Sequence, residues 1–296
     1  MSEERKLTDI FIVPPISVLD VKQKYWKDRK KMWLSYNIQS ELGRNDNLLK
    51  LSDLLKKKQK PTSVFDPVLC EIMYKWFSNE NDIVFDPFAG GSVRGIVASK
   101  TKRNYYGIDL RSEQVEHNYI QSKEICDSNY PHWEIGSSAE IGIPYQYDLF
   151  FTCPPYYDLE VYSNNDKDIS NMSVDEFDSV YETIIEKSLI NLKDNRFAAI
   201  VLGDVRGSDG NYLRLIQKTI DIFERNGCKY YNDMILLQEP ATAAMRSFNY
   251  MNASRKIAKC HQNVLIFIKG DAKIATNRLQ PFDNSKESDS LDCFLS

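Results

Sequence analysis

The pattern of hydrophobic positions becomes regular from Thr62 onward, where short apolar runs alternate with stretches whose apolar residues recur at helical spacing. An alternation of strands and helices is typical of a mostly parallel sheet with helices on both faces. We therefore expect an α/β fold of the doubly wound type. The predicted strands are 82–86, 105–110, 148–152, 197–202, 231–237 and 263–269, and the predicted helices are 67–77, 93–100, 113–126, 174–192 and 212–226.

The two ends of the chain have a different pattern from the centre. Near the N-terminus, residues 19–36 predict a helix in which Trp26 and Trp33 are interleaved with basic residues. The C-terminal residues are polar and have no hydrophobic period, as in a disordered tail. We therefore predict three parts: a separate basic helical element over 1–60, an α/β domain over 61–270 and a disordered tail over 271–296.

Charge is distributed unevenly along the chain. The formal net charge is −4, yet the segment from Lys22 to Lys60 holds twelve Lys or Arg and four Asp or Glu. A basic segment in an acidic chain is typical of a protein that meets phosphate groups on one face. A solvated basic helix without a partner gives the same pattern, so both interpretations stay open at this point.

Composition excludes several classes of protein. The hydrophobic content of 42% is ordinary for a globular protein, and no apolar run approaches the roughly 18 residues that cross a bilayer. The first six residues are polar and lack a signal sequence. The six cysteines form no CxxC pair, and the three histidines have no ligand-like spacing. These features argue against a disulfide framework or a metal site, and fit a cytoplasmic protein.

A glycine-containing turn follows the first predicted strand of the α/β domain. Residues 86–92 read DPFAGGS, and Asp109 ends the next strand about twenty residues later. Glycines let the backbone approach a ligand, and an acid at that distance suits hydrogen bonding to ribose hydroxyls. Neither the GxGxxG pattern of dinucleotide sites nor the GKS or GKT of triphosphate sites is present. The pair of features therefore predicts a cofactor that carries a nucleoside.

A second motif, Cys153-Pro154-Pro155-Tyr156, follows the strand predicted at 148–152. Alone, such a sequence is most often an ordinary turn. In this order, however, the two motifs resemble the DPFAGSGT and DPPY motifs of the amino-directed DNA methyltransferases, which methylate adenine N6 or cytosine N4. Residues 10–270 are similar to a group of phage and bacterial DNA methylases that modify or protect a genome, as in restriction–modification. The resemblance implies a Rossmann-like class I methyltransferase fold of the seven-stranded type.

The resemblance also implies the cofactor, S-adenosyl-L-methionine, and the residues that contact it. The segment around Asp66 resembles the family's motif that closes over the methionine part of the cofactor. Ser138 stands where the family often has an acid for the adenine amino group, and a hydroxyl is a weaker partner. Arg94 departs from the usual Thr-Gly at the start of the following helix. The implied cofactor contacts are Asp66, Asp86, Phe88, Gly90, Asp109 and Ser138.

The residues implied to be catalytic are Cys153, Pro154, Pro155 and Tyr156. An exocyclic amine is a poor nucleophile, since its lone pair is delocalised into the base. Hydrogen bonds to a side-chain acceptor and to a rigid proline carbonyl localise that lone pair, while an aromatic ring stacks on the flipped base. Sulfur is a weak acceptor. Cys153 is therefore a stand-in for serine, a covalent nucleophile as in cytosine-C5 methyltransferases, or a sign of altered or lost chemistry.

The expected partner is DNA, with the target base flipped into the site. DNA contacts are expected from the N-terminal element, from 156–172 or from 240–261, where basic residues lie among aromatic ones. Asp204 and Arg206 either line the base pocket or pair with each other. The analogy of Cys153 with serine slightly favours cytosine N4 over adenine N6 as the methylated atom. An RNA methyltransferase and a non-catalytic binding module with the same fold are the alternatives.

Overall fold

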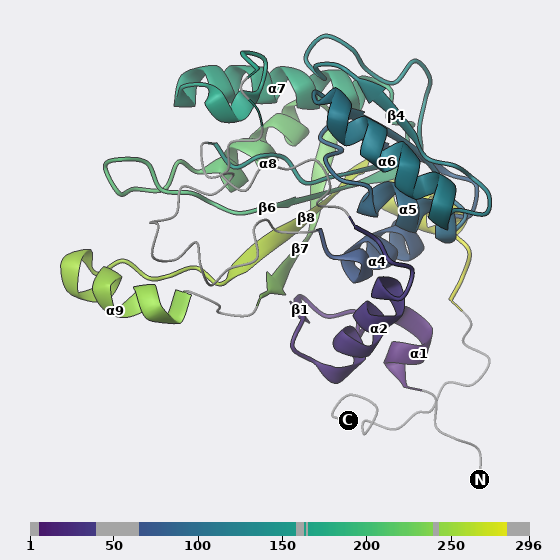
Figure 1. The fold of residues 1–296 in the computed structure, drawn as a ribbon, viewed down its shortest axis with the longest axis horizontal. Coiled ribbons are helices and arrows are strands. Elements are labelled where there is room, and N and C mark those ends of the chain that lie inside the picture. The colour runs from purple at the N-terminus through teal and green to yellow at the C-terminus, as the bar shows by residue number, and fades with distance from the viewer. Residues whose placement is uncertain (1–5, 40–64, 158–162, 164, 239–242, 283–296) are drawn as a thin grey trace.

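The computed structural model describes residues 6–39, 65–157, 163, 165–238 and 243–282. Its centre is an eight-stranded sheet in the order β1-β7-β8-β6-β5-β2-β3-β4, in which only the pairs that involve β8 are antiparallel (Figure 1). The strands are β1 (Val18–Asp20), β2 (Ile83–Asp86), β3 (Asn104–Asp109), β4 (His132–Ile135), β5 (Leu149–Thr152), β6 (Arg196–Leu202), β7 (Cys228–Leu237) and β8 (His261–Lys269). The predicted α/β class is confirmed, with one strand, β1, beyond the expected seven.

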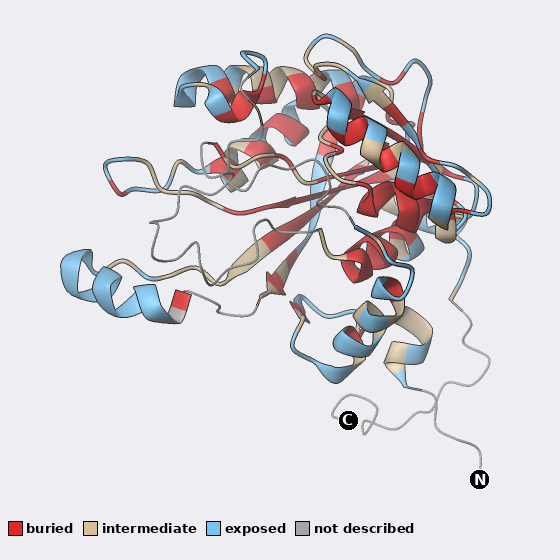
Figure 2. Ribbon diagram, viewed as in Figure 1, coloured by how far each residue is buried: buried red, intermediate tan, exposed pale blue. Residues whose placement is uncertain are grey.

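Helices cover both faces of the sheet because side chains alternate between the faces along each strand. In β2, Val84 packs into one buried cluster and Phe85 into the other. The first cluster includes residues of α2, α4, α5, α6 and α10, and the second includes α7 and α8. The helices are α1 (Leu7–Phe11), α2 (Lys24–Leu34), α4 (Pro67–Phe77), α5 (Val93–Lys100), α6 (Ser112–Ile125), α7 (Val174–Ile190), α8 (Leu215–Arg225), α9 (Ala243–Ser254) and α10 (Ala272–Arg278). Figure 2 shows the buried strands between these layers and the exposed surface of α9.

Most predicted elements of the α/β domain are confirmed, and α4 and α5 have the predicted bounds. Asp66 caps α4 by accepting a hydrogen bond from the Val68 amide, and Pro67 occupies the first helical position, where its missing N–H is harmless. The elements β4 and α9 have no counterpart among the predicted elements. The predicted tail over 271–296 is wrong in its first part, since α10 packs there with Ala275 buried; residues 283–296 lie outside the described residues.

The N-terminal segment packs against the main core. The helix predicted for 19–36 begins only at Lys24, because Val18–Asp20 forms the edge strand β1 and pairs with β7. Trp26 and Trp33 are buried against α4, so these tryptophans serve packing. The residues 40–60 of the predicted element lie outside the described residues.

A buried carboxylate of α4 binds the basic face of α2. Glu71 is 1% exposed and accepts hydrogen bonds from the guanidinium of Arg29 and from Trp33 Nε1, the latter at 2.8 Å. Burial raises the pKa of Glu71, but the bonds from Arg29 and Trp33 lower it more, and the net shift is downward. Part of the basic charge predicted to face phosphate is therefore used inside the protein.

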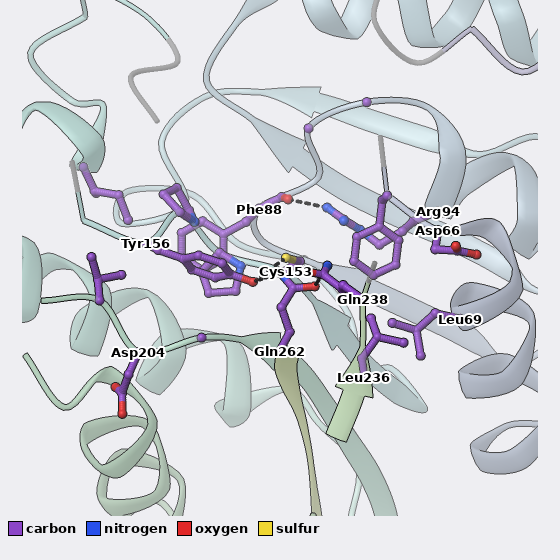
Figure 3. A pocket seen from close by; sticks show the side chains of 18 of the residues that line it. Asp66, Leu69, Phe88, Arg94, Cys153, Tyr156, Asp204, Leu236, Gln238 and Gln262 are labelled. Atoms are coloured by element: carbon purple, nitrogen blue, oxygen red, sulfur yellow. Dashed lines mark hydrogen bonds between the residues drawn. The ribbon is translucent and has the colours of Figure 1, made fainter. Parts of the chain in front are cut away.

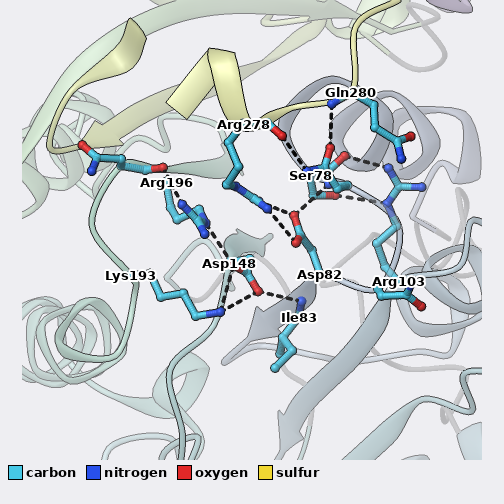
Figure 4. A network of polar contacts seen from close by, with 12 residues as sticks. Ser78, Asp82, Ile83, Arg103, Asp148, Lys193, Arg196, Arg278 and Gln280 are labelled. Atoms are coloured by element: carbon cyan, nitrogen blue, oxygen red, sulfur yellow. Dashed lines mark hydrogen bonds and ion pairs between the residues drawn. The ribbon is translucent and has the colours of Figure 1, made fainter. Parts of the chain in front are cut away.

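Ionic contacts also connect residues at the end of the sheet where β2 and β5 begin (Figure 4). Asp148 accepts hydrogen bonds from Lys193 Nζ at 3.0 Å, from Arg196 Nε at 2.9 Å and from the Ile83 amide at 3.2 Å. Beside it, Arg278 of α10 forms an ion pair with Asp82. This network holds the C-terminal helix to the edge opposite the carboxyl ends of β2 and β5.

The network should make stability depend on pH. Burial raises the pKa of Asp148, but the hydrogen bonds from Lys193, Ile83 and Arg196 lower it by more. The resulting pKa of Asp148 lies below its ordinary value of 3.8. A depressed carboxyl pKa stabilises the fold above the unfolded-state pKa, and this stabilisation is lost as pH falls through the folded-state pKa. We expect urea unfolding to show a wild-type advantage over Asp148→Asn that is constant above about pH 5 and shrinks below about pH 4. An advantage that is the same at pH 3 and pH 7 would contradict this assignment.

Candidate functional site

One large cavity lies at the carboxyl ends of β2, β3, β5 and β6, where open α/β sheets bind ligands (Figure 3). Its volume is about 990 Å³, the upper end of the range for small-molecule sites. Nine of the ten predicted site residues line it. They are Asp66, Phe88, Gly90, Asp109, Ser138, Cys153, Pro154, Pro155 and Tyr156.

The glycine turn and the acid of β3 are held together by one hydrogen bond. The Gly90 amide donates to Asp109 Oδ2 at 2.8 Å, and Gly90 has a φ of 53°, in the left-handed region that favours glycine. The Arg111 amide donates to Asp109 Oδ1 at 2.9 Å. A carboxylate can accept about four hydrogen bonds. These two contacts therefore orient Asp109 at the cavity wall without by themselves exhausting its acceptors.

Asp86 differs from the prediction, because it does not line the cavity. Its carboxylate is 0% exposed and lies beneath the turn. It accepts hydrogen bonds from Arg94 Nε at 2.5 Å, from Tyr105 Oη at 2.7 Å and from Thr152 Oγ1 at 2.5 Å. Asp86 thus joins the turn after β2 to the end of β5, immediately before Cys153.

Arg94, the residue that departs from the family pattern, is the buried cation of this arrangement. Its Nη2 donates to the Phe88 carbonyl at 2.6 Å and to the Ala89 carbonyl at 2.9 Å. Burial lowers the pKa of Arg94, but the Asp86 carboxylate raises it by more, and the resulting pKa is well above its ordinary value. The guanidinium therefore stays charged, fixes the shape of the turn and lies 4.7 Å from the Phe65 ring centroid.

Ser138 and Phe88 also line the cavity, near the Gly90 turn. Ser138 Oγ donates to the Pro87 carbonyl at 2.6 Å, which ties the loop after β4 to the turn after β2. The Phe88 ring stacks on Tyr181 of α7, with centroids 6.2 Å apart. Ser138 is therefore positioned by a backbone acceptor, and its oxygen can still accept a bond from a ligand.

At the end of the cavity near α4, Asp66 pairs with residues of α2. Its Oδ2 accepts from Lys30 Nζ at 2.9 Å and from Trp26 Nε1 at 3.2 Å, while its Oδ1 caps α4. Both Lys30 and Asp66 line the cavity. The N-terminal segment thus supplies a cation to the site, a role that differs from the predicted one of meeting DNA.

The Cys153–Tyr156 loop enters the cavity from the end of β5. Cys153 Sγ lies 3.4 Å from Tyr156 Oη, and Gln262 Nε2 donates to that hydroxyl at 2.7 Å. Gln238 Nε2 in turn donates to Gln262 Oε1 at 2.8 Å, and Figure 3 shows both glutamines beside Cys153. Two strand-end glutamines from β8 and its neighbour β7 therefore set the tilt of the Tyr156 ring, and no motif in the sequence marks them.

The next residue, Tyr157, anchors the loop to the helices. It has a φ of 53°, and its ring centroid is 4.2 Å from that of Phe177. Its hydroxyl donates to Asp178 Oδ1 at 2.8 Å and accepts from Lys218 Nζ at 3.2 Å. Burial and the Asp178 bond raise the pKa of Tyr157, so this anchor stays protonated. The second tyrosine turns the chain and leaves the first one facing the cavity.

Polar residues surround the outer part of the cavity. Asp204 and Arg206 both line it but do not form the predicted alternative of a mutual salt bridge: Arg206 lies 4.0 Å from the Tyr212 ring centroid and donates to the Gly210 carbonyl. Lys259 and His261 line the same region. Burial lowers the pKa of Lys259, while Asp204 and Asp233 oppose that shift.

The part of the chain that the structure describes shows neither a metal-binding cluster nor a membrane-spanning helix. No group of three or more His, Cys, Asp or Glu residues there is arranged to hold a metal ion. Nor is any helix within the described ranges both long and apolar enough to cross a membrane.

The chain is similar to several solved methyltransferase structures at low sequence identity. The chain is 13% identical to a methyltransferase from Pyrococcus furiosus, covering 83% of this chain and 98% of that one, with a TM-score of 0.48. It is 10% identical to a magnesium protoporphyrin IX methyltransferase from Synechocystis PCC 6803 (81% and 97% covered, TM-score 0.46). It is also 13% identical to TrmN from Thermus thermophilus, with a TM-score of 0.44. That match covers 69% of this chain but only 48% of the length of TrmN.

Family comparison gives a more specific result. No curated protein matches the chain in sequence. Residues 6–122 match the family model for N6 and N4 methyltransferases, described as DNA methylase. The match spans α2, the Asp66 segment, the Gly90 turn and Asp109. Over these residues the chain is similar to the amino-directed DNA methyltransferases, a family that takes its methyl group from S-adenosyl-L-methionine.

Proposed function

We propose that this protein methylates an exocyclic amine of DNA, cytosine N4 or adenine N6, with S-adenosyl-L-methionine as methyl donor. The observation that carries the proposal is the shared cavity: the Gly90 turn, Asp109 and the Cys153–Tyr156 loop all line it. A cofactor site and a base site in one cavity are what direct transfer from sulfur to nitrogen requires, since the reacting atoms must meet in line.

The residues present fit the cofactor. The amide of the left-handed Gly90 orients Asp109, whose carboxylate suits the two hydroxyls of a ribose. Phe88 and Ser138 offer an apolar wall and a hydroxyl for an adenine ring. Asp66 supplies an anion at the far end, where an amino acid's ammonium group would lie. When bound, the cofactor supplies an electrophilic methyl group on a sulfonium.

The Cys153–Tyr156 loop is suited to hold the base. In our proposal, the Pro154 carbonyl accepts a hydrogen bond from the amine, and the Tyr156 ring stacks on the base. The amine nitrogen forms a bond to the methyl carbon as the bond from that carbon to sulfur breaks, and the amine then releases one proton to solvent. Pro154 is buried, its ring fixes its φ, and Pro155 after it restricts its ψ, so the direction of the Pro154 carbonyl is constrained before the base arrives.

DNA contact is supported by the segment that contains α9. Residues 243–262 include Arg246, Arg255, Lys256, Lys259 and His261 and no Asp or Glu. Arg246, Lys259 and His261 line the outer cavity, and α9 is largely exposed, with Phe248 at 73%. Cations beside exposed aromatic side chains are typical of surfaces that bind nucleic acid. We propose that α9 lies against the duplex while the flipped base enters the cavity, and that the protein acts in the cytoplasm.

Incubation with methyl-labelled cofactor and either DNA or RNA, followed by mass analysis of the nucleosides, tests the proposal. We expect label in N4-methylcytosine or N6-methyladenine from DNA. Label only in RNA favours the RNA methyltransferase alternative, and 5-methylcytosine favours covalent chemistry. Binding of DNA and cofactor without any transfer, across duplexes of random sequence, favours the non-catalytic module.

Substitution of Cys153 separates the alternatives for the loop. If Cys153 stands in for serine, Cys153→Ser should keep methyl transfer within about threefold of wild type or raise it, because oxygen is the better acceptor. Cys153→Ala should lower transfer by about 2- to 10-fold, the range for one neutral hydrogen bond. Single-turnover kinetics on a duplex that the wild-type protein methylates measure the transfer rates of both variants. Abolished transfer in Cys153→Ser would instead indicate a thiolate nucleophile.

A further inference from the structure

One end of the cavity contains a polar cluster that the residues of the glycine turn and the base loop do not explain. Asp66 and three cations, Lys27, Lys30 and Arg94, line this end, next to the apolar side chains of Leu69 and Leu236. Figure 3 shows Asp66, Arg94 and Leu69 on the side of Cys153 that faces away from Asp204. An anion and cations together in an otherwise apolar wall suit a ligand group that itself carries both charges.

Arg94 and Lys30 differ in how far the protein already uses their donors. Arg94 directs its Nε to Asp86 and its Nη2 to two backbone carbonyls, so most of its guanidinium holds the turn. The Lys30 ammonium has three donors, and its described hydrogen bond is the one to Asp66 at 2.9 Å. The Lys30 side chain is 43% exposed, while that of Asp66 is 13% exposed. Lys30 is therefore better able than Arg94 to meet an incoming anion.

We propose that Lys30 of α2 binds the α-carboxylate of the cofactor's methionine part, while Asp66 binds its ammonium group. This inference rests on the proposed function for the direction of the cofactor, with its ribose at Asp109. The opposite end of the cofactor is an amino-acid zwitterion, and the Lys30–Asp66 pair presents one charge to each half of it. A lysine that already pairs with a carboxylate also presents a less attractive site to a polyanion, because the pair is locally neutral.

The proposal changes the role of the basic N-terminal helix. The sequence pattern equally suggests that its lysines meet DNA phosphates. Lys30 points into the cavity beside Asp66, whereas its neighbour Lys31 is 78% exposed and lies near Asp28. Lys30 and Lys31 therefore provide a test residue and a matched control on one helix. In the proposal Lys30 contacts the cofactor, while Lys31 faces solvent.

Binding of two ligands tests the inference without any need for turnover. S-adenosyl-L-homocysteine carries the amino-acid end, and 5′-deoxy-5′-methylthioadenosine has the same nucleoside and thioether but lacks that end. Calorimetric titration of the full chain should give about 5- to 20-fold weaker binding of S-adenosyl-L-homocysteine to Lys30→Gln, the range for one charge-assisted hydrogen bond of a half-exposed lysine. Binding of methylthioadenosine should stay within about twofold. Lys31→Gln should leave both affinities unchanged, and Lys30→Arg should restore most of the difference.

The outcomes separate this inference from the proposed function. If the wild-type protein binds neither ligand, the cofactor assignment itself fails. If it binds both and Lys30→Gln changes neither, or weakens both equally, the assignment of Lys30 to the carboxylate is overturned. A Lys30→Gln variant that binds S-adenosyl-L-homocysteine normally but has a smaller salt dependence of DNA binding would return Lys30 to the DNA face.

Discussion

Replacing Asp86 with alanine should lower the free energy of unfolding by about 3–5 kcal/mol, the usual effect of removing one partner from a buried ion pair. Asp86 is 0% exposed, and its loss would leave the Arg94 guanidinium, itself 5% exposed, without its anion. Tyr105 and Thr152 would lose their acceptor at the same time. Urea unfolding followed by circular dichroism measures the change, with an unaltered m-value as the sign of a native-state effect.

The ion pair of the exposed Asp127 with Lys100 provides the control. Its aspartate side chain is 86% exposed, so Asp127→Ala should change the free energy of unfolding by less than about 0.5 kcal/mol. A double variant, Asp86→Leu with Arg94→Met, should recover part of the stability lost in Asp86→Ala, because it removes the unpaired buried charge. A loss below about 1 kcal/mol in Asp86→Ala would mean that water reaches Arg94 and that the turn is not held as described.

Replacing Tyr156 with alanine should lower kcat/KM for methyl transfer to DNA by about 10- to 100-fold, the effect of losing one base–aromatic stack. The ring lines the cavity and is held by the Gln262 amide, so it is placed before the base arrives. Its removal should leave the affinity for S-adenosyl-L-homocysteine within about twofold of wild type, since the predicted cofactor contacts lie on other segments. Steady-state kinetics with a labelled methyl donor, together with calorimetric titration, measure the two effects.

Tyr156→Phe is the matched control for the ring. It keeps the aromatic face and removes the hydroxyl that contacts Gln262 and the Val201 carbonyl. We expect kcat/KM within about fivefold of wild type, the range for neutral hydrogen bonds that water can replace. If Tyr156→Ala and Tyr156→Phe were equally impaired, the hydroxyl rather than the ring would carry the effect, and the stacking role would be wrong. Equal loss of cofactor affinity in Tyr156→Ala would place the ring at the cofactor instead.

The sequence determined much of the fold and most of the cavity wall because the relevant signals are local. Apolar periodicity gives strands and helices directly, and α4 and α5 have the predicted bounds since a cap and a proline mark the start of one and glycines precede the other. Turn residues such as Gly90 and Pro154 report a backbone conformation that their own chemistry imposes. Parallel strands then bring the ends of β2, β3 and β5 to one edge.

Tertiary structure decided which of these residues face the cavity and what else joins them. Asp86 ends its strand just as Asp109 does, yet Asp86 is buried by Arg94, Tyr105 and Thr152, partners that lie up to 66 positions away. Lys30 reaches Asp66 across 36 positions, and Gln262 reaches Tyr156 across 106. Contacts at such separations depend on packing and charge pairing in three dimensions, and they leave no periodic or motif signal along the chain. The same reason explains α10, whose polar sequence becomes ordered through Ala275 and the Arg278–Asp82 pair.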